Sequence, residues 1–125
     1  MLTNLLQVAA GGAIGASARY LTNVSATRFL GHGFPWGTII ANIAGSFLMG
    51  VIVVVLARKG GNAYAPLIMT GMLGGFTTFS AFSLDTFTLV ERGDIWQAAL
   101  YVLGTLAIGL AAIVAGVLVT RALMA

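Results

Sequence analysis

The feature that most constrains this chain is the recurrence of long apolar stretches separated by short polar turns. Residues 3–23, 36–57, 64–90 and 95–120 are each long enough to cross a bilayer, since a spanning helix needs about 20 mostly apolar residues. The charged side chains lie between these stretches or near their ends. The sequence therefore predicts an all-α integral membrane protein with four transmembrane helices in a single domain, residues 1–125.

Composition supports a lipid environment. Of the 125 residues, 59% are hydrophobic, the mean hydropathy is +1.02, and only six basic and three acidic residues are present. So few charges cannot cover the surface of a soluble domain, and the scattered net charge of +3 forms no nucleic-acid-binding patch. There is no cysteine and only one histidine, and the three acids lie near one turn, so the chain offers no catalytic constellation and is not expected to be an enzyme.

Loop charges leave the orientation open. Four crossings place both termini and the middle loop on one side with Arg58, Lys59 and Arg121, whereas Arg28 and Arg92 lie on the other. Basic residues mark the cytoplasmic side of a membrane protein. A difference of three basic residues on one side against two on the other is too small to fix the orientation. One orientation could prevail, or the chain could insert both ways and form an antiparallel dimer.

No Lys or Arg precedes the first apolar stretch, which favours a retained helix over a cleaved signal peptide.

The third span, 64–90, differs from the others because glycine and hydroxyl side chains cluster in it: Thr70, Gly71, Gly74, Gly75, Thr77, Thr78, Ser80 and Ser83. Glycine disfavours helix, and Ser and Thr compete for backbone hydrogen bonds. Free backbone groups are tolerated inside a membrane only where protein or water satisfies them. This pattern favours a helix broken in mid-membrane and buried in an assembly over an ordinary helix whose small residues serve packing.

Small residues also recur at four-residue spacing, in the pattern that lets helix backbones approach closely: Gly11/Gly15, Gly37/Ala41/Gly45, Gly71/Gly75 and Ala112/Gly116. Four helices enclose little space by themselves, so a homo-oligomer is expected.

Neutral side chains within the spans are candidates for binding an anion. Asn42 lies in the second span with Thr38 and Ser46 one turn away on the same face, and its amide could donate to an anion or simply join two helices. Phe79 and Phe82 are neighbours on one face, and their electropositive ring edges could face an anion, although such pairs are usually packing.

Polar residues near the span ends have two readings each. Arg19 could attract anions at a pore mouth or anchor its helix at the interface. Tyr101 and Thr105 are one turn apart and could continue a line of hydroxyls, but Tyr101 could equally be an interfacial aromatic residue. Asp85 is grouped with the charged residues 91–94 as part of a solvated turn.

Three motifs stand in order on the first three spans. The first is Gly-Ala-Ile-Gly-Ala-Ser-Ala-Arg-Tyr (12–20). The second combines Trp36-Gly37-Thr38, Ala41-Asn42 and Gly45-Ser46-Phe47. The third is Gly-Gly-Phe-Thr-Thr-Phe-Ser-Ala-Phe-Ser (74–83). Together they resemble the Fluc (CrcB) family of fluoride channels, and the resemblance extends over essentially the whole chain.

The resemblance implies a dual-topology, antiparallel homodimer in the bacterial inner (plasma) membrane, which passively exports cytoplasmic fluoride and so relieves its toxicity. The fluoride pore would be lined by Asn42, Phe79 and Phe82, with hydroxyl donors from Thr38, Ser80, Tyr101 and Thr105. It further implies that Arg19 lies near an aqueous vestibule, and that backbone carbonyls of Gly74 and Thr77 bind a structural sodium ion at the dimer centre. The chain departs from the family at Ala81, where many members have threonine, and at Gly109, where some have serine.

Two other functions compete with a fluoride channel. A small four-helix multidrug and proton antiporter has similar length, but members of that class carry an acidic residue in the first span, and residues 1–23 contain none. A non-transporting anchor or assembly subunit would not need the clustered polar groups of the third span.

Overall fold

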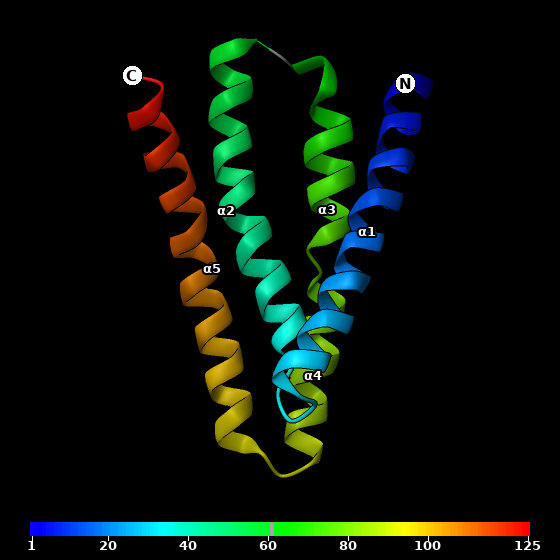
Figure 1. The fold of residues 1–125 in the computed structure, drawn as a ribbon, viewed down its shortest axis with the longest axis vertical. Coiled ribbons are helices and arrows are strands. Elements are labelled where there is room, and N and C mark those ends of the chain that lie inside the picture. The colour runs from blue at the N-terminus through cyan, green and yellow to red at the C-terminus, as the bar shows by residue number, and fades with distance from the viewer. Residues whose placement is uncertain (61) are drawn as a thin grey trace.

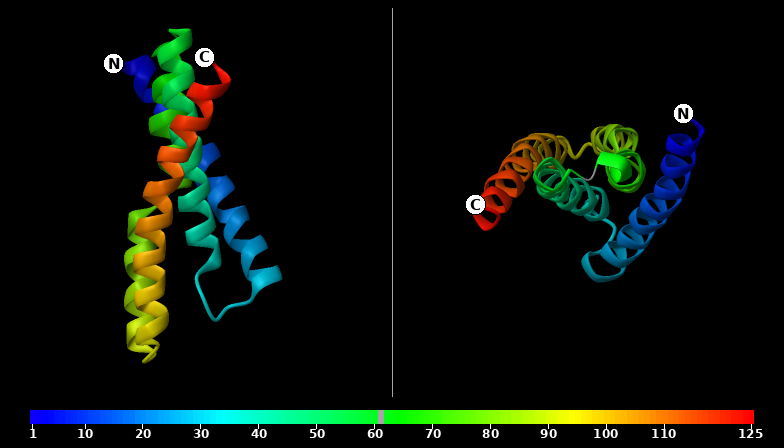
Figure 2. Two further views of the ribbon diagram at one scale, coloured as in Figure 1. Left: turned by 90° about the vertical axis from the view of Figure 1, so that its left-hand side faces the viewer. Right: turned by 90° about the horizontal axis from the view of Figure 1, so that it is seen from above.

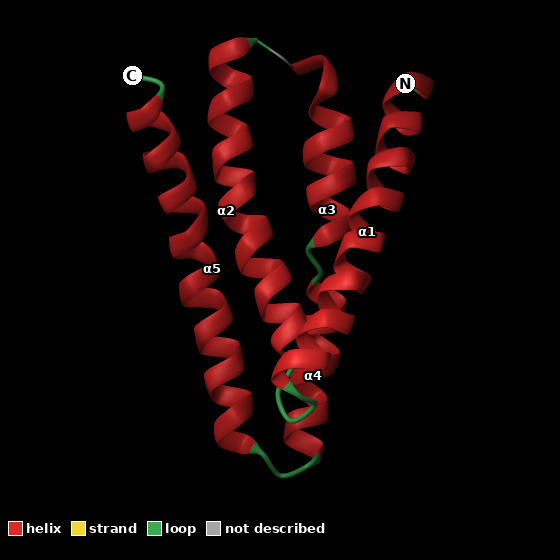
Figure 3. Ribbon diagram, viewed as in Figure 1, coloured by secondary structure: helices red, strands yellow, loops and turns green. Residues whose placement is uncertain are grey.

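The computed structural model describes residues 1–60 and 62–125. They form α1 (Leu2–Leu30), α2 (Trp36–Lys59), η1 (Asn62–Tyr64), η2 (Pro66–Leu73), α3 (Gly74–Phe76), α4 (Phe79–Glu91) and α5 (Ile95–Leu123). The chain runs alternately down and up, so both termini lie at one end of the molecule together with the end of α2 (Figure 1). Within the described residues every regular element is helical, as Figure 3 shows, and the all-α prediction is confirmed.

Length and composition identify three helical segments that could cross a membrane: Trp36–Lys59, Asn62–Glu91 and Ile95–Leu123. The fourth, α1, has 29 residues and is equally long, but it carries Asn4, Gln7 and Arg19 and is more polar. Its place beside η2 gives part of this polar surface a protein neighbour, so four crossings fit the arrangement. The chain is a multi-pass membrane protein.

Glycines end the helices where the chain reverses direction. Gly31, Gly60 and Gly93 have φ of 89°, 68° and 83°, in the left-handed region that side chains disfavour. The first helix continues seven residues beyond the predicted span, to Leu30, so most of the predicted polar turn 24–35 is helical. Polar residues leave a helix intact when their backbone groups stay paired, and here the N–H of Gly31 still donates to the carbonyl of Thr27 at 3.0 Å.

Packing divides the helices into two groups, α2 with α5 and α1 with η2 and α3. Seen from above, α1 and α5 lie on opposite sides, with the η2–α4 segment between them at one edge (Figure 2). The helices approach through glycines: a Cβ on Gly11 or Gly15 would meet the η2 and α3 backbone, and one on Gly50 or Gly116 would meet the facing backbone of α5 or α2. The four-residue spacing of small residues thus marks real close approaches.

Large apolar side chains remain exposed along the helices, among them Leu5, Leu48, Phe87, Leu103 and Leu110. Among the described residues, Leu89 and Tyr101 are the largest fully buried side chains. Exposed leucine and phenylalanine over so much of a helical surface match a lipid or protein environment rather than water.

Candidate functional site

The helical path between α3 and α4 is interrupted at Thr77 and Thr78, which have extended backbones (φ −87°, ψ 156° and φ −153°, ψ 127°). The interruption is visible as the loop segment between α3 and α4 in Figure 3. Extended residues cannot continue the helical hydrogen-bond ladder, so the backbone groups around them need other partners.

Asn42 of α2 supplies two of those partners. Its Nδ2 donates to the carbonyl of Thr78 at 3.0 Å, and its Oδ1 accepts from the Thr78 N–H at 2.7 Å. The amide therefore pairs with Thr78 as a neighbouring strand would. An amide nitrogen carries two N–H groups, so one of them is left for another acceptor.

The side chain of Thr78 begins α4. Its Oγ1 accepts from the N–H of Ala81 at 3.2 Å, which is the geometry of a helix N-cap, and it lies 3.2 Å from Oγ of Ser80. The Ser80 hydroxyl is exposed and close to this cap. The α4 end of the interruption is thus held by hydroxyl and amide side chains rather than by the helix itself.

Arg19 of α1 binds the other end of the interruption. Its Nε donates to the carbonyl of Gly75 at 3.1 Å, in the last turn of α3, and the side chain is half-buried. The last carbonyls of a helix carry partial negative charge and lack helical partners, so a guanidinium is a suitable cap. Nothing in the sequence predicts this contact, because Arg19 and Gly75 are 56 residues apart.

Two carbonyls near the interruption lose their helical donors. The N–H of Thr78 would pair with the carbonyl of Gly74 in a continuous helix, but it donates to Asn42. In the same way the N–H of Ala81 would pair with the carbonyl of Thr77, but it donates to the Thr78 side chain. Unpaired carbonyl oxygens are suitable ligands for a small monovalent cation. The carbonyl groups of Gly74 and Thr77 therefore fit the expected sodium ion.

Aromatic side chains line the start of α4. Phe79 is 77% exposed, Phe82 is 9% exposed, and their ring centroids lie 5.8 Å apart. The Phe82 ring also packs at 5.2 Å against Tyr101 of α5, which in turn meets Phe34 edge-on at 5.5 Å. Phe79 therefore presents a ring to the surroundings of the chain, whereas Phe82 is held within it.

Tyr101 is fully buried, and its hydroxyl donates to Oδ2 of Asp85 at 3.0 Å. The expectation that Asp85 belongs to a solvated turn is wrong, because the residue lies within α4, is half-buried and accepts this bond from α5. Nothing in the neighbouring sequence predicts the bond between Asp85 and Tyr101. The presence of an acidic residue within a predicted span is, however, in itself an indication of a functional role. Because Tyr101 is buried within the protein, it is not an aromatic residue that lies at the membrane interface.

Two separate hollows lie near these residues. The first, which we call the Asn42 groove, has a volume of about 290 Å³, and its lining includes Asn42, Ser46, Thr78, Phe79, Phe82 and Thr105. This is room for several waters, since one water occupies about 30 Å³ in the liquid. The groove brings together four of the expected pore residues, Asn42, Phe79, Phe82 and Thr105, but not Thr38, Ser80 or Tyr101.

The second hollow, the Asp85 groove, is lined by residues that include Thr38, Asp85 and Arg92. Thr38 is buried, at 5% exposure. Phe82 lines the Asn42 groove and packs on Tyr101, and Tyr101 donates to Asp85, which lines the other groove. Tyr101 itself lines neither groove and is in contact with one residue of each.

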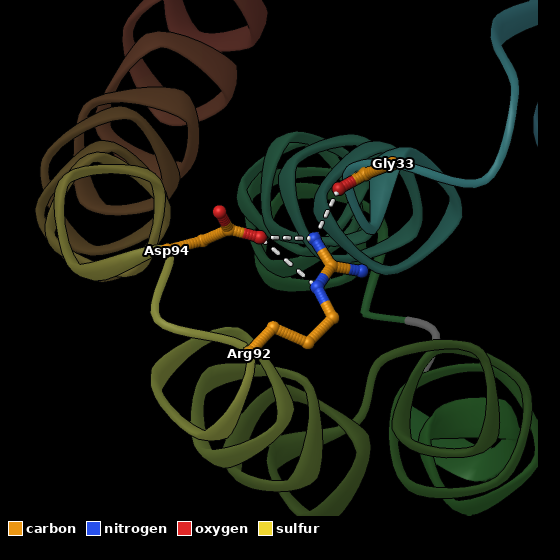
Figure 4. Close-up of polar contacts among 3 residues, drawn as sticks. All are labelled: Gly33, Arg92 and Asp94. Carbon is orange, nitrogen blue, oxygen red and sulfur yellow. Dashed lines mark hydrogen bonds and ion pairs between the residues drawn. The ribbon is translucent and has the colours of Figure 1, made fainter.

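Arg92 is a charged residue of the Asp85 groove lining. Its Nε and Nη2 donate to Oδ2 of Asp94 at 3.0 and 2.7 Å, and Nη2 also donates to the carbonyl of Gly33 at 2.8 Å (Figure 4). The guanidinium thus joins the α1–α2 connection to the α4–α5 turn. Both charged side chains are exposed, so the pair contributes little stability beyond positioning these loops.

The fold and this site define a small multi-pass membrane protein with neutral polar groups gathered along its helices. The CrcB-like protein family, described as Camphor Resistance (CrcB), matches residues 6–117. The chain is 62% identical over 125 residues to a protein of Cereibacter sphaeroides named fluoride-specific ion channel FluC, with both chains fully covered. It is 55% identical over 125 residues to the protein of that name in Paracoccus denitrificans, again with both chains fully covered. In Roseobacter denitrificans the identity is 51% over 122 residues, covering 96% of this chain and 97% of the relative. The chain belongs to the CrcB family.

Proposed function

We propose that this chain is a subunit of a passive, fluoride-selective channel that exports cytoplasmic fluoride. The observation that carries the proposal is similarity over the full length, at 62% identity, to a protein named fluoride-specific ion channel FluC. The expected motifs occur in this sequence, and four of the expected pore residues line one groove. The function is not enzymatic, since transport through an open pore breaks no bond.

The polar groups of the grooves suit an anion that must pass rather than stay. The remaining N–H of Asn42, the Thr105 hydroxyl and the ring edges of Phe79 and Phe82 offer partial positive charge without a formal charge. A binding site must be favourable enough to admit an ion and weak enough to release it. We assign these residues to the fluoride pore, with Thr38, Ser80 and Tyr101 as further hydroxyls along it.

The driving force is the membrane potential, which supplies about 2.3 kcal/mol per elementary charge per 100 mV. A potential that is negative inside expels an anion through any open selective pore. This scheme needs no proton-coupling carboxylate of the antiporter class, and α1 contains no acidic residue, which disfavours that alternative. Because the curated relatives are bacterial, we place the protein in the bacterial inner membrane.

The working unit in this proposal is an antiparallel, dual-topology homodimer. The near balance of basic residues between the two sides of the membrane supports dual topology. The exposed Phe79 ring and the thin array of four helices support a dimer, because both need a second protein surface to cover them. We propose that the interruption at Thr77 and Thr78 lies within the bilayer at the dimer centre, with Arg19 beside the vestibule.

The carbonyls of Gly74 and Thr77, freed of their helical donors, would hold a structural sodium ion together with those of the second copy. A cation bound there would neutralise the carbonyl ends of both interrupted helices and join the subunits.

Reconstituted protein tests the function directly. Liposomes loaded with fluoride should release it to an external fluoride electrode without a proton gradient. Asn42→Ala should slow release by about tenfold or more, since a hydrogen bond to a charged group is worth about 1.5–3 kcal/mol. Phe82→Ile should also slow release, because it removes the electropositive ring edge. Thr22→Ala is the matched control, because the Thr22 hydroxyl donates to the Ala18 carbonyl and lies off both grooves.

Asn42→Ala also frees the Thr78 backbone, so each variant is first checked for assembly by size-exclusion chromatography. Native rates in both assembled variants would refute the pore assignment, while native protein that releases no fluoride would refute the function. Drug–proton exchange would instead support the antiporter.

A further inference from the structure

Charged side chains are divided unequally between the two ends of the molecule. The end that holds both termini and the end of α2 (Figure 1) carries three basic side chains and no acidic one: Arg58, Lys59 and Arg121. The opposite half carries two basic and all three acidic side chains: Arg28, Arg92, Asp85, Glu91 and Asp94. The formal side-chain charge is therefore +3 at the first end, which we call the basic end, and −1 at the other.

Arg58 lies where the contact between α2 and α5 ends. Gly50 and Val54 precede it at four-residue intervals on the same face of α2, and both are buried. On α5, Thr120 is buried one turn before Met124. Nη1 of Arg58 donates to the carbonyl of Met124 at 3.1 Å. This bond joins the last turns of the two helices and leaves the guanidinium with further N–H donors for a ligand.

Lys59 and Arg121 lie beside this bond. Lys59 follows Arg58 directly, and Arg121 precedes Met124 by three residues, a spacing that makes neighbours on a helix surface. The three basic side chains are exposed, and none forms an ion pair within the described part of the chain. A helix end carries about half a negative charge, so three basic residues exceed what the ends of α2 and α5 can neutralise.

Apolar side chains are exposed next to this charge, toward the middle of the molecule. Leu118 lies three residues before Arg121 on the same side of α5, and Val53 lies five residues before Arg58, about 7.5 Å along α2. Positive charge at the ends of two spanning helices, with apolar surface alongside, matches a phospholipid better than a soluble anion, because a soluble anion would use the charge alone.

We propose that Arg58, Lys59 and Arg121 bind the phosphate headgroup of an anionic phospholipid, whose acyl chains lie along the exposed apolar side chains of α2 and α5. A guanidinium binds phosphate oxygens through its fixed fork of N–H groups, and an ammonium binds them as a point charge. The site goes beyond the proposed fluoride pathway, since none of the three residues lines either groove. In the proposed antiparallel dimer each leaflet receives one such site.

Native mass spectrometry of the protein in a non-ionic detergent measures this binding without any fluoride flux. We expect phosphatidylglycerol to bind at least tenfold more tightly than phosphatidylcholine with the same acyl chains, at one tightly held lipid per chain. The physical reason is that each basic residue near a membrane surface contributes about fivefold to the attraction of anionic lipid. Arg58→Gln/Lys59→Gln/Arg121→Gln should bind both lipids equally.

Two further variants control for structure and for net charge. Lys59→Gln with Arg121→Gln keeps the Arg58 bond to Met124 and should still lower the preference for phosphatidylglycerol by about fivefold or more. Arg28→Gln removes an exposed basic side chain from the opposite end and should keep the native preference.

A preference that is present in the native protein and in Arg28→Gln, and that falls in the double and triple variants, supports the site. Equal binding of the two lipids by the native protein, a preference that survives in the triple variant, or an equal loss in Arg28→Gln overturns it. Displacement of phosphatidylglycerol by an equal concentration of inorganic phosphate also overturns it, because the acyl chains would then contribute nothing. These measurements contain no fluoride, so the lipid site and the proposed function can fail separately.

Discussion

At the scale of single residues, the site is built from side chains that stand in for missing backbone partners. Asn42 pairs with both backbone groups of Thr78, Thr78 caps α4, and Arg19 binds the carbonyl of Gly75. Each contact satisfies a group that an interrupted helix would leave unpaired, which matters most where water is scarce. The same side chains that could meet an ion therefore also hold the segment in shape.

Tyr101 separates these two roles experimentally. Tyr101→Phe keeps the ring against Phe82 but removes the bond to Asp85, so it should cost about 1 kcal/mol of unfolding free energy. Tyr101→Ala also removes the buried ring and should cost about 3–5 kcal/mol, judged from large-to-small core substitutions. Denaturation in detergent measures both. Fluoride release should slow in Tyr101→Phe despite its near-native stability, and an unchanged rate would remove this hydroxyl from the pathway.

Sequence reasoning could identify residue types but not their partners. Asn42 and Thr78 are 36 residues apart, and nothing local says that the amide meets this backbone rather than lipid or another side chain. The same limit explains the misplaced Asp85, whose role depends on Tyr101 of another helix. Such pairs depend on the angle and position at which two helices pack, and the periodicity of apolar residues along the sequence does not specify these.

At the scale of elements, the apolar runs were enough to predict the all-helical architecture, because a bilayer restricts spanning segments to helices or closed barrels. The helix ends were harder, since α1 runs to Leu30 through residues polar enough to resemble a turn. The glycine spacing predicted close helix contacts but not which helices meet. In the structure Gly11 faces η2, while Gly116 faces α2.

The contact of α1 with η2 gives a stability prediction with an adjacent control. A Cβ on Gly11 would meet backbone atoms of Leu67, Gly71 and Met72, none of which can rotate away, whereas one on Gly12 would meet nothing within 4 Å. Gly11→Ala should therefore lose about 1–3 kcal/mol through overpacking. Gly12→Ala should be neutral or gain up to about 1 kcal/mol, because alanine favours helix. Thermal unfolding of the two variants in the same detergent compares them, and equal melting temperatures would contradict the close approach.

At the scale of the whole molecule, one copy offers an incomplete set of surfaces. Phe79 is largely exposed although it lies beside the interruption, and Gly74 is exposed as well. A second copy in the opposite orientation would cover both and would bring two interrupted segments together. The proposed dual topology and the proposed pore thus depend on each other.

Loop charge provides the means to test that dependence. The native chain has Arg58, Lys59 and Arg121 on the side of its termini against Arg28 and Arg92 on the other, a difference small enough to permit both orientations. Adding two lysines to the first side, by Asn62→Lys with Ala63→Lys, should fix all copies with their termini in the cytoplasm. Adding two to the other side, by His32→Lys with Glu91→Lys, should fix the reverse.

Tags on the termini of the native protein should be accessible from both sides of the membrane in one preparation, whereas each charge-biased variant should be accessible from one side only. Each variant alone should then release fluoride poorly because antiparallel pairs cannot form, and co-expression of the two should restore release by supplying one subunit of each orientation. A biased variant that conducts normally by itself, with its tags on a single side, would show that parallel copies or single chains suffice and would rule out the antiparallel dimer.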